Sequence, residues 1–151
     1  DLKHGRTVHS LAELIARNYP DVQLRFVSPP QLQMPEEVVS EVASHGTVAT
    51  AHDSLEDVIA ETDVLYVTRV QKERFSDPEE YEALKLRYVV TPESLAEGNA
   101  KDSLVIMHPL PRVGEIDPRV DEDPRAAYFR QMENGMFVRM ALIALVMGGE
   151  L

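Results

Sequence analysis

The apolar positions of this chain alternate between short β-like runs and stretches with helical spacing. Apolar residues recur three or four positions apart over residues 7–18 and predict a helix, whereas residues 22–27 alternate and predict a strand. Further strands are expected near Val48 and at 64–67 and 104–107, with a short strand or extended piece at 88–90. Further helices are expected at 35–46, 54–61, 78–86, 92–97 and 126–147, with a long acidic loop at 113–124. This order predicts an α/β fold with a doubly wound, Rossmann-like parallel sheet and helices on both faces.

The strand expected at residues 64–67 is predicted to be buried and to lead into a polar loop. In open α/β sheets, ligands bind at the carboxyl ends of the strands. Arg69 and Gln71 lie two positions apart, so in extended backbone their side chains leave on the same side. A guanidinium grips a carboxylate through two parallel hydrogen bonds, and an amide both donates and accepts. The pair therefore predicts a small ligand that carries a carboxylate and an amine.

The neighbouring charges have a simpler explanation. Lys72, Glu73 and Arg74 follow directly and are most simply read as a solvated loop or the start of a helix.

Two other segments carry similar chemistry. Arg6 lies just ahead of the first helix, where free N–H groups favour anions. On this segment alone, a threonine cap with two solvated bases is the better explanation. Prolines 109 and 111 stiffen residues 108–112, so the carbonyl oxygens of Pro109 and Leu110 can be held toward a ligand N–H. Because all three segments lie at predicted strand ends or helix starts, we expect them to form one site.

Composition excludes several classes of function. At 151 residues the chain is expected to form one domain, and its net charge of −11 makes a sequence-independent grip on nucleic acid or on an anionic membrane unfavourable. The absence of cysteine excludes a disulfide, a thiolate nucleophile and a Cys-ligated metal, and no cofactor is predicted. The longest apolar run, residues 140–147, is far shorter than the ~20 residues of a membrane span. The chain lacks an initiator Met, and we interpret it as a fragment of a larger protein.

Four motifs resemble a known family. They are DLKHGRTVHSL at 1–11, TRVQKERF at 68–75, MHPLPR at 107–112 and DPRAAYFRQ at 123–131. Together they resemble the aspartate-binding half of aspartate carbamoyltransferase, and the last is most similar to the version in the multifunctional pyrimidine-synthesis polypeptide of animals and fungi. The resemblance implies that residues 1–151 form one subdomain and that the carbamoyl-phosphate-binding subdomain lies outside this chain.

The resemblance also implies a reaction and the residues that bind its substrates. The family transfers the carbamoyl group of carbamoyl phosphate to L-aspartate in pyrimidine synthesis. By the family pattern, Arg6 and Arg69 each pair with one carboxylate of aspartate and Gln71 positions its amine. The remaining site residues are Pro109, Leu110 and Pro111, through their backbone toward the amine and carbamoyl phosphate, and the supporting Lys3, Lys72 and Arg112.

Departures from the family pattern limit what this chain is expected to do alone. The carbamoyl-phosphate motif, the carbonyl-polarising histidine and the lysine loop donated by a neighbouring subunit are absent. We therefore expect no appreciable turnover and at most weak aspartate affinity from the isolated chain. The family also implies a cytoplasmic homotrimer, and an apolar strand upstream of Asp1, without which the sheet is gapped or another segment fills the place. The last helix is apolar nearly all round, which predicts that one side meets this sheet and another meets the missing subdomain.

Two alternatives stay open. The chain could be a non-catalytic ligand-sensing or assembly module on the same fold, although a scaffold has no physical need for two convergent arginines. Ornithine carbamoyltransferase is the related competitor, but its pattern carries a His-Cys-Leu-Pro segment, and this chain has no cysteine. Arg69 would also repel the side-chain ammonium of ornithine.

Overall fold

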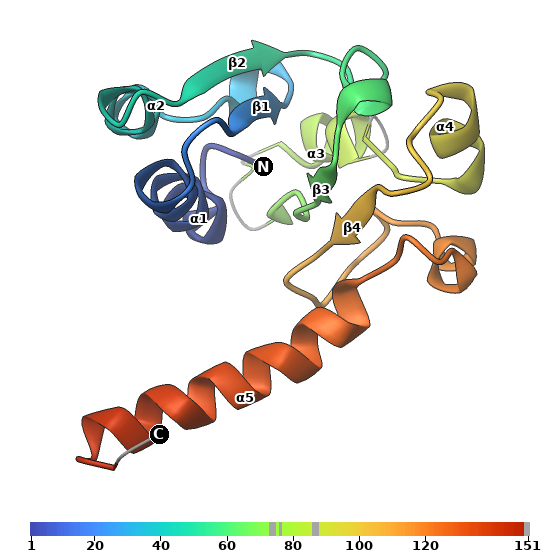
Figure 1. The fold of residues 1–151 in the computed structure, drawn as a ribbon. Helices are drawn as coiled ribbons and strands as arrows, with labels where there is room; N and C mark the ends of the chain where they lie inside the picture. The colour runs from blue at the N-terminus through green and yellow to red at the C-terminus, as the bar shows by residue number, and fades with distance from the viewer. Residues whose placement is uncertain (73–74, 76, 86–87, 150–151) are drawn as a thin grey trace.

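Short parallel strands and helices alternate along the chain in the computed structural model, which describes residues 1–72, 75, 77–85 and 88–149 (Figure 1). The strands are β1 (Gln23–Val27), β2 (Val48–His52), β3 (Val64–Tyr66) and β4 (Val105–Met107). The α-helices are α1 (Arg6–Asn18), α2 (Glu36–Ser44), α3 (Pro78–Lys85), α4 (Pro92–Glu97) and α5 (Tyr128–Val146), with 3-10 helices η1 (Pro30–Leu32), η2 (Ile59–Glu61) and η4 (Pro118–Glu122). The predicted α/β class is confirmed.

The strands pair in parallel, as predicted, but in two separate sheets. β1 pairs with β2 from Gln23↔Val48 onward, and β3 pairs with β4 from Val64↔Val105 onward. Within the described residues, no strand ladder joins one pair to the other. The division matches the gapped sheet that was one expected outcome. It also corrects the prediction that β3 is buried, because a strand paired on one side leaves Val64 54% exposed.

Each sheet has its own apolar core. The small and β-branched residues of α1 and α2 pack together over β1 and β2, in a cluster formed by Val8, Ala12, Ala16, Met34, Val38 and Val42. α4, η4 and the start of α5 enclose β3 and β4, in a cluster formed by Ile59, Val67, Val90, Leu95, Leu104, Ile106, Ile116, Val120 and Tyr128. Burial of these side chains is the main stabilising contribution to each half of the fold.

Two predicted segments have a different local structure. The helix expected at residues 54–61 is reduced to turns followed by η2, because the Ser54 hydroxyl accepts the Glu56 N–H two residues on rather than capping a longer helix. The loop expected at 113–124 contains η4, which begins at Pro118 after Asp117 accepts the Arg119 N–H at 2.8 Å. The piece expected at 88–90 forms no strand, and Val90 makes only an isolated parallel bridge with Ile116. The other predicted elements are present within a few residues, although Leu86, the predicted end of α3, lies outside the described residues.

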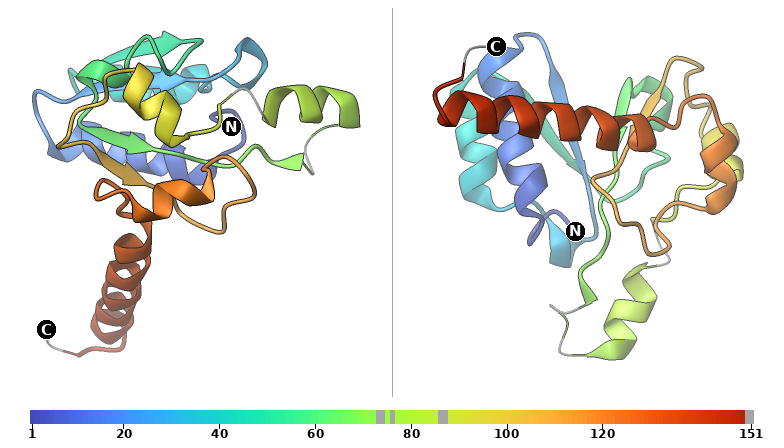
Figure 2. Two further views of the ribbon diagram at one scale, coloured as in Figure 1. Left: turned by 90° about the vertical axis from the view of Figure 1, so that its right-hand side faces the viewer. Right: turned by 90° about the horizontal axis from the view of Figure 1, so that it is seen from below.

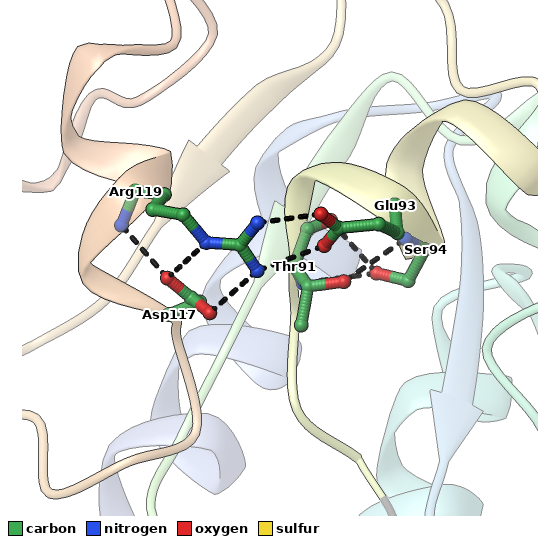
Figure 3. A network of polar contacts seen from close by, with 5 residues as sticks. All are labelled: Thr91, Glu93, Ser94, Asp117 and Arg119. Carbon is green, nitrogen blue, oxygen red and sulfur yellow. Dashed lines mark hydrogen bonds and ion pairs between the residues drawn. The ribbon is translucent and has the colours of Figure 1, made fainter.

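α4 is fixed by a cap and by a surface ion pair (Figure 3). Thr91 and Ser94 form a capping box, each side chain accepting the backbone N–H of the other at 3.0 Å. Arg119 of η4 bridges Glu93 and Asp117, at 2.5 Å and 2.9 Å. Because these charges are exposed, the bridge aligns η4 with α4 but contributes little to stability.

α5 is packed only at its beginning. Tyr128 is fully buried against β4, and the rest of the helix projects from the body of the molecule (Figure 1; Figure 2, left). The prediction that one side of this helix meets the sheet is therefore wrong beyond its first turns. Among the described residues, no helix combines the length and the apolar character that a bilayer crossing requires.

Candidate functional site

Two loops leave the same edge of the β3–β4 sheet. The parallel register places Tyr66 beside Met107, so the segments that follow both strands begin side by side. The Val67 N–H donates to the Met107 carbonyl at 2.9 Å and continues the ladder past the end of β3. The turn before α1 lies against the first of these loops, because the Gln71 side-chain amide donates to the His4 carbonyl at 3.2 Å. Three segments far apart in the sequence therefore meet at one edge.

A cavity of about 240 Å³ lies between these segments. It is lined by His4, Gly5, Arg6, Thr7, Thr68, Arg69, Gln71, His108, Pro109, Leu110 and Pro111. The six main residues of the predicted site are all among them. Two arginines, a glutamine and a proline-rich segment therefore line one small cavity.

The first turn of α1 forms part of the cavity wall. Arg6 is the first residue of the helix, and Gly5 precedes it without a side chain to cap the free N–H groups. A Cβ atom at Gly5 would lie 2.6 Å from the Asp1 carbonyl oxygen, so the tight approach requires glycine. The positive end of the helix and the Arg6 guanidinium both favour an anion at this position.

Asp1 joins the first turn to the loop after β3. Its buried carboxylate accepts the His4 backbone N–H at 3.0 Å and lies 3.2 Å from the His4 ring Nδ1. It also accepts a longer bond of 3.5 Å from the Gln71 backbone N–H. The sequence analysis missed this residue. An aspartate three positions before a histidine is a turn signal, but the contact with Gln71 cannot be read from spacing.

The loop after β4 combines unusual backbone with a buried histidine. Leu110 has a φ of +48°, and the bond between Leu110 and Pro111 is cis. The Leu110 N–H donates to the His108 ring at 2.8 Å. The two prolines were predicted to hold this segment; the histidine ring, whose role was not predicted, holds it as well.

Glu115 lies behind His108 as a buried carboxylate. Burial opposes its ionisation, but hydrogen bonds from the His108 ring, the Val113 N–H and its own backbone N–H outweigh that effect and lower the pKa of Glu115. The carboxylate is therefore present in ionised form beneath the loop.

Arg112 lies outside the cavity lining. Its guanidinium binds both oxygens of Asp121, at 2.6 Å for Nη2, and its Cζ lies 5.6 Å from the Tyr128 ring centroid. The Tyr128 hydroxyl donates to Asp121 at 2.5 Å. These hydrogen bonds lower the pKa of Asp121, while burial and the Asp121 carboxylate raise the pKa of Tyr128 to about 12. Arg112 thus anchors the end of the loop to η4 and α5.

The other supporting cations also lie outside the lining. Lys3 is exposed, and the Lys72 Nζ lies 5.8 Å from the ring centroid of Tyr81. Glu73 and Arg74, which were interpreted as solvated, lie outside the described residues. Among the residues that the structure does describe, no cluster of His, Asp or Glu could hold a metal ion.

Comparison with known proteins identifies the family of this chain. Residues 1–146 match the family model described as "Aspartate/ornithine carbamoyltransferase, Asp/Orn binding domain". The chain is 55% identical over 148 residues to the multifunctional protein pyr1-3 of Dictyostelium discoideum, covering 98% of this chain and 6% of that protein. It is 51% identical over 149 residues to the aspartate carbamoyltransferase catalytic subunit of Methanopyrus kandleri, covering 99% of this chain and 47% of that subunit.

Solved structures of similar chains have the same fold. The catalytic subunit of aspartate transcarbamoylase from M. jannaschii matches with a TM-score of 0.85 and 45% identity, over 95% of this chain and 46% of that one. Aspartate transcarbamoylase from Trypanosoma cruzi, in complex with carbamoyl phosphate, matches with a TM-score of 0.83 and 44% identity, over 95% and 46%. The chain therefore spans about half the length of these enzyme subunits.

Proposed function

The chain belongs to the aspartate/ornithine carbamoyltransferase family, and we propose that it is the L-aspartate-binding half of an aspartate carbamoyltransferase. The observation that carries the proposal is the convergence of Arg6 and Arg69 on one cavity of about 240 Å³. Two guanidinium groups match the two carboxylates of aspartate, and each can bind one of them through paired hydrogen bonds.

The remaining lining residues suit the amine. The Gln71 side-chain nitrogen is held by the His4 carbonyl, which fixes the orientation of the amide at the cavity. Pro109 and Pro111 lack N–H groups, so the backbone beside Leu110 presents mainly carbonyl oxygens, which accept hydrogen bonds from an ammonium or amine. The arginines on this edge therefore suit the carboxylates of the substrate, and the carbonyl oxygens suit its nitrogen.

In the proposed reaction, the amine nitrogen of L-aspartate attacks the carbonyl carbon of carbamoyl phosphate. A C–N bond forms, the C–O bond to phosphate breaks and phosphate leaves with the electron pair. The proton that the nitrogen loses is taken up by the departing phosphate. The residues of this chain contribute by orienting the amine and neutralising the carboxylates, and no covalent intermediate with the protein is required.

The second substrate calls for residues beyond this chain. Because the chain covers about half of the catalytic-subunit relatives, we assign carbamoyl phosphate mainly to a separate carbamoyl-phosphate-binding subdomain. A homotrimer in the cytoplasm is part of the same proposal. The isolated chain should show no appreciable turnover in a carbamoylaspartate assay. Normal turnover would contradict the assignment of carbamoyl phosphate to a separate subdomain.

Aspartate is favoured over ornithine by the same cations. The family model covers both substrates, but ornithine carries an ammonium at the end of its side chain, which Arg6 and Arg69 would repel. A cavity with two cations instead suits a dicarboxylate.

The test is calorimetric binding of L-aspartate, or of a bisubstrate analogue, to the polypeptide that holds both halves. Arg69→Ala should weaken binding about 100-fold to 1000-fold, because it removes charge-assisted hydrogen bonds of about 1.5–3 kcal/mol each. Arg17→Ala is the matched control, since Arg17 lies at the far end of α1 and pairs with Glu41 at 2.5 Å. Unchanged affinity in Arg69→Ala would favour the non-catalytic module.

A further inference from the structure

The backbone N–H and both ring nitrogens of His108 have partners within the chain. Its backbone N–H donates to the side-chain oxygen of Gln131 on α5 at 2.9 Å. Its ring lies between Leu110 and Glu115, with Nδ1 2.8 Å from the Leu110 backbone nitrogen and Nε2 2.7 Å from a Glu115 carboxylate oxygen. The side chain is 1% exposed. A ring so enclosed is held in one orientation.

The two ring contacts determine where the ring proton lies. The Leu110 backbone nitrogen can only donate, so Nδ1 must accept and carries no proton. Glu115 is an acceptor, so Nε2 carries the proton and donates it. The hydrogen-bond network therefore assigns the neutral Nε2–H tautomer. In this state the ring donates to the buried Glu115 carboxylate and accepts from the Leu110 backbone amide, so it links the position of that amide to Glu115.

The amide that receives this support belongs to a strained residue. Leu110 lies in the left-handed region, with φ +48°, where a side chain crowds the backbone of any residue but glycine. It also lines the cavity, between two prolines that can donate no backbone hydrogen bond. The Leu110 N–H is thus the one backbone donor of residues 109–111, and the His108 ring accepts it.

The support behind the ring is equally fixed. The second Glu115 oxygen accepts the Val113 N–H at 3.0 Å, so this carboxylate closes the loop on its far side. Gln131 ties the near side to α5. The chain of contacts runs from rigid elements through Glu115 and His108 to Leu110.

We propose that His108 is a positioning residue for substrate binding: its ring accepts the Leu110 N–H and thereby holds the Leu110 backbone in the strained conformation that faces aspartate. This inference rests on the proposed function, because the proposed function is what assigns L-aspartate to the cavity that Leu110 lines. His108 does not touch the reacting atoms, and its effect is transmitted through Leu110.

Two substitutions separate positioning from simple burial. His108→Asn places an oxygen near the position of Nδ1, so it can still accept the Leu110 N–H but cannot reach Glu115. His108→Gln places a donor near the position of Nε2, so it can still reach Glu115 but offers nothing to Leu110. Each variant loses one buried hydrogen bond, and His108→Asn should lower the thermal unfolding midpoint at least as much as His108→Gln, because it leaves the ionised Glu115 without a donor. A larger effect of His108→Gln on affinity would therefore not come from lost stability.

Aspartate affinity is then measured by calorimetry in the polypeptide that holds both halves. His108→Gln should raise the Kd for aspartate about tenfold or more, the equivalent of one lost hydrogen bond, whereas His108→Asn should remain within about threefold of the unsubstituted protein. Equal effects of the two variants on Kd would overturn the inference. Absence of aspartate binding in the unsubstituted protein would instead overturn the proposed function itself.

Hydrogen exchange provides a second readout that does not depend on either variant folding. Because Pro109 and Pro111 have no amide hydrogen, Leu110 carries the only exchangeable backbone amide of residues 109–111, and mass spectrometry of a peptide across this segment can follow it. In the unsubstituted protein this amide should exchange far more slowly than an open loop. Exchange at the rate of an unstructured peptide would overturn the inference.

Discussion

The two ends of α5 belong to one helix but lie in opposite environments. At the first turn, Tyr128 is fully buried and its hydroxyl binds Asp121. Further along, Phe137 is 54% exposed and Val146 86% exposed, and neither apolar core includes a residue beyond Tyr128. The same helix is thus a structural anchor at one end and uncovered apolar surface at the other.

The difference shows which parts of the molecule this chain stabilises by itself. The beginning of α5 supports the cavity, because Gln131 holds the His108 backbone and Tyr128 contacts the Arg112–Asp121 pair. The far end supports nothing within the described residues. Exposed apolar side chains gathered along one helix are typical of a protein interface, which agrees with the proposal that a second subdomain covers them.

Tyr128→Ala should have the largest effect on stability. The substitution removes a buried aromatic ring from the core of the β3–β4 half and leaves Asp121 without one of its donors, so the free energy of unfolding should fall by about 3–5 kcal/mol. Urea unfolding followed by circular dichroism measures this change. A cost below about 1 kcal/mol, the size expected for one net hydrogen bond, would show that the amino end of α5 is not an anchor.

Acid should destabilise the anchored region by an intermediate amount. The pKa values of Glu115 and Asp121 are lowered in the folded protein, so the stability that these carboxylates contribute is complete above their ordinary pKa values and is lost as the pH falls through the folded ones. The loss should begin below about pH 4.5 and reach about 1–2 kcal/mol, as expected for hydrogen bonds to a charged group.

Urea unfolding at a series of pH values tests this expectation. Glu115→Gln should flatten the dependence, because the substituted side chain does not titrate. Residues 136–149 contain no carboxylate, so the helicity of that segment should change least. A dependence as steep in Glu115→Gln as in the unsubstituted protein would assign the acid sensitivity to other groups.

Phe137→Ala should have the smallest effect. Because more than half of this side chain is exposed, its removal in the isolated chain should change the free energy of unfolding by no more than about 0.5 kcal/mol. The comparison with Tyr128→Ala is matched, since both remove an aromatic ring from α5. A cost comparable to that of Tyr128→Ala would mean that the far end is packed in solution.

Much of the site could be predicted because its residues follow local rules. Arg69 and Gln71 come directly after an apolar strand, and Arg6 begins a helix whose periodicity is plain. Parallel pairing of β3 with β4 then brings the loops that follow them to one edge. None of this requires knowledge of long-range contacts beyond the order of the elements.

What the sequence did not indicate depends on partners distant along the chain. The contact between Asp1 and Gln71 spans 70 positions, and nothing in the spacing of either residue points to the other. The role of His108 likewise depends on a turn that returns Glu115 to its ring. The apolar composition of α5 indicates that its surface needs cover, but it cannot say that this chain covers only the first turns.

The two separate sheets have a consequence for handling the protein. In the described ranges β1, β2 and β3 each pair on one edge alone, which leaves backbone N–H and C=O groups open to another strand. The outer edge of β4 is covered, because the Ile106 N–H donates to the Arg125 carbonyl and the Ile106 carbonyl accepts the Ala127 N–H. The main safeguard against such pairing between molecules is mutual repulsion from the net charge of −11. Repulsion of this kind decays over about 10 Å in 0.1 M salt. Concentrated stocks of the chain should therefore keep best in dilute buffer, where its copies stay apart.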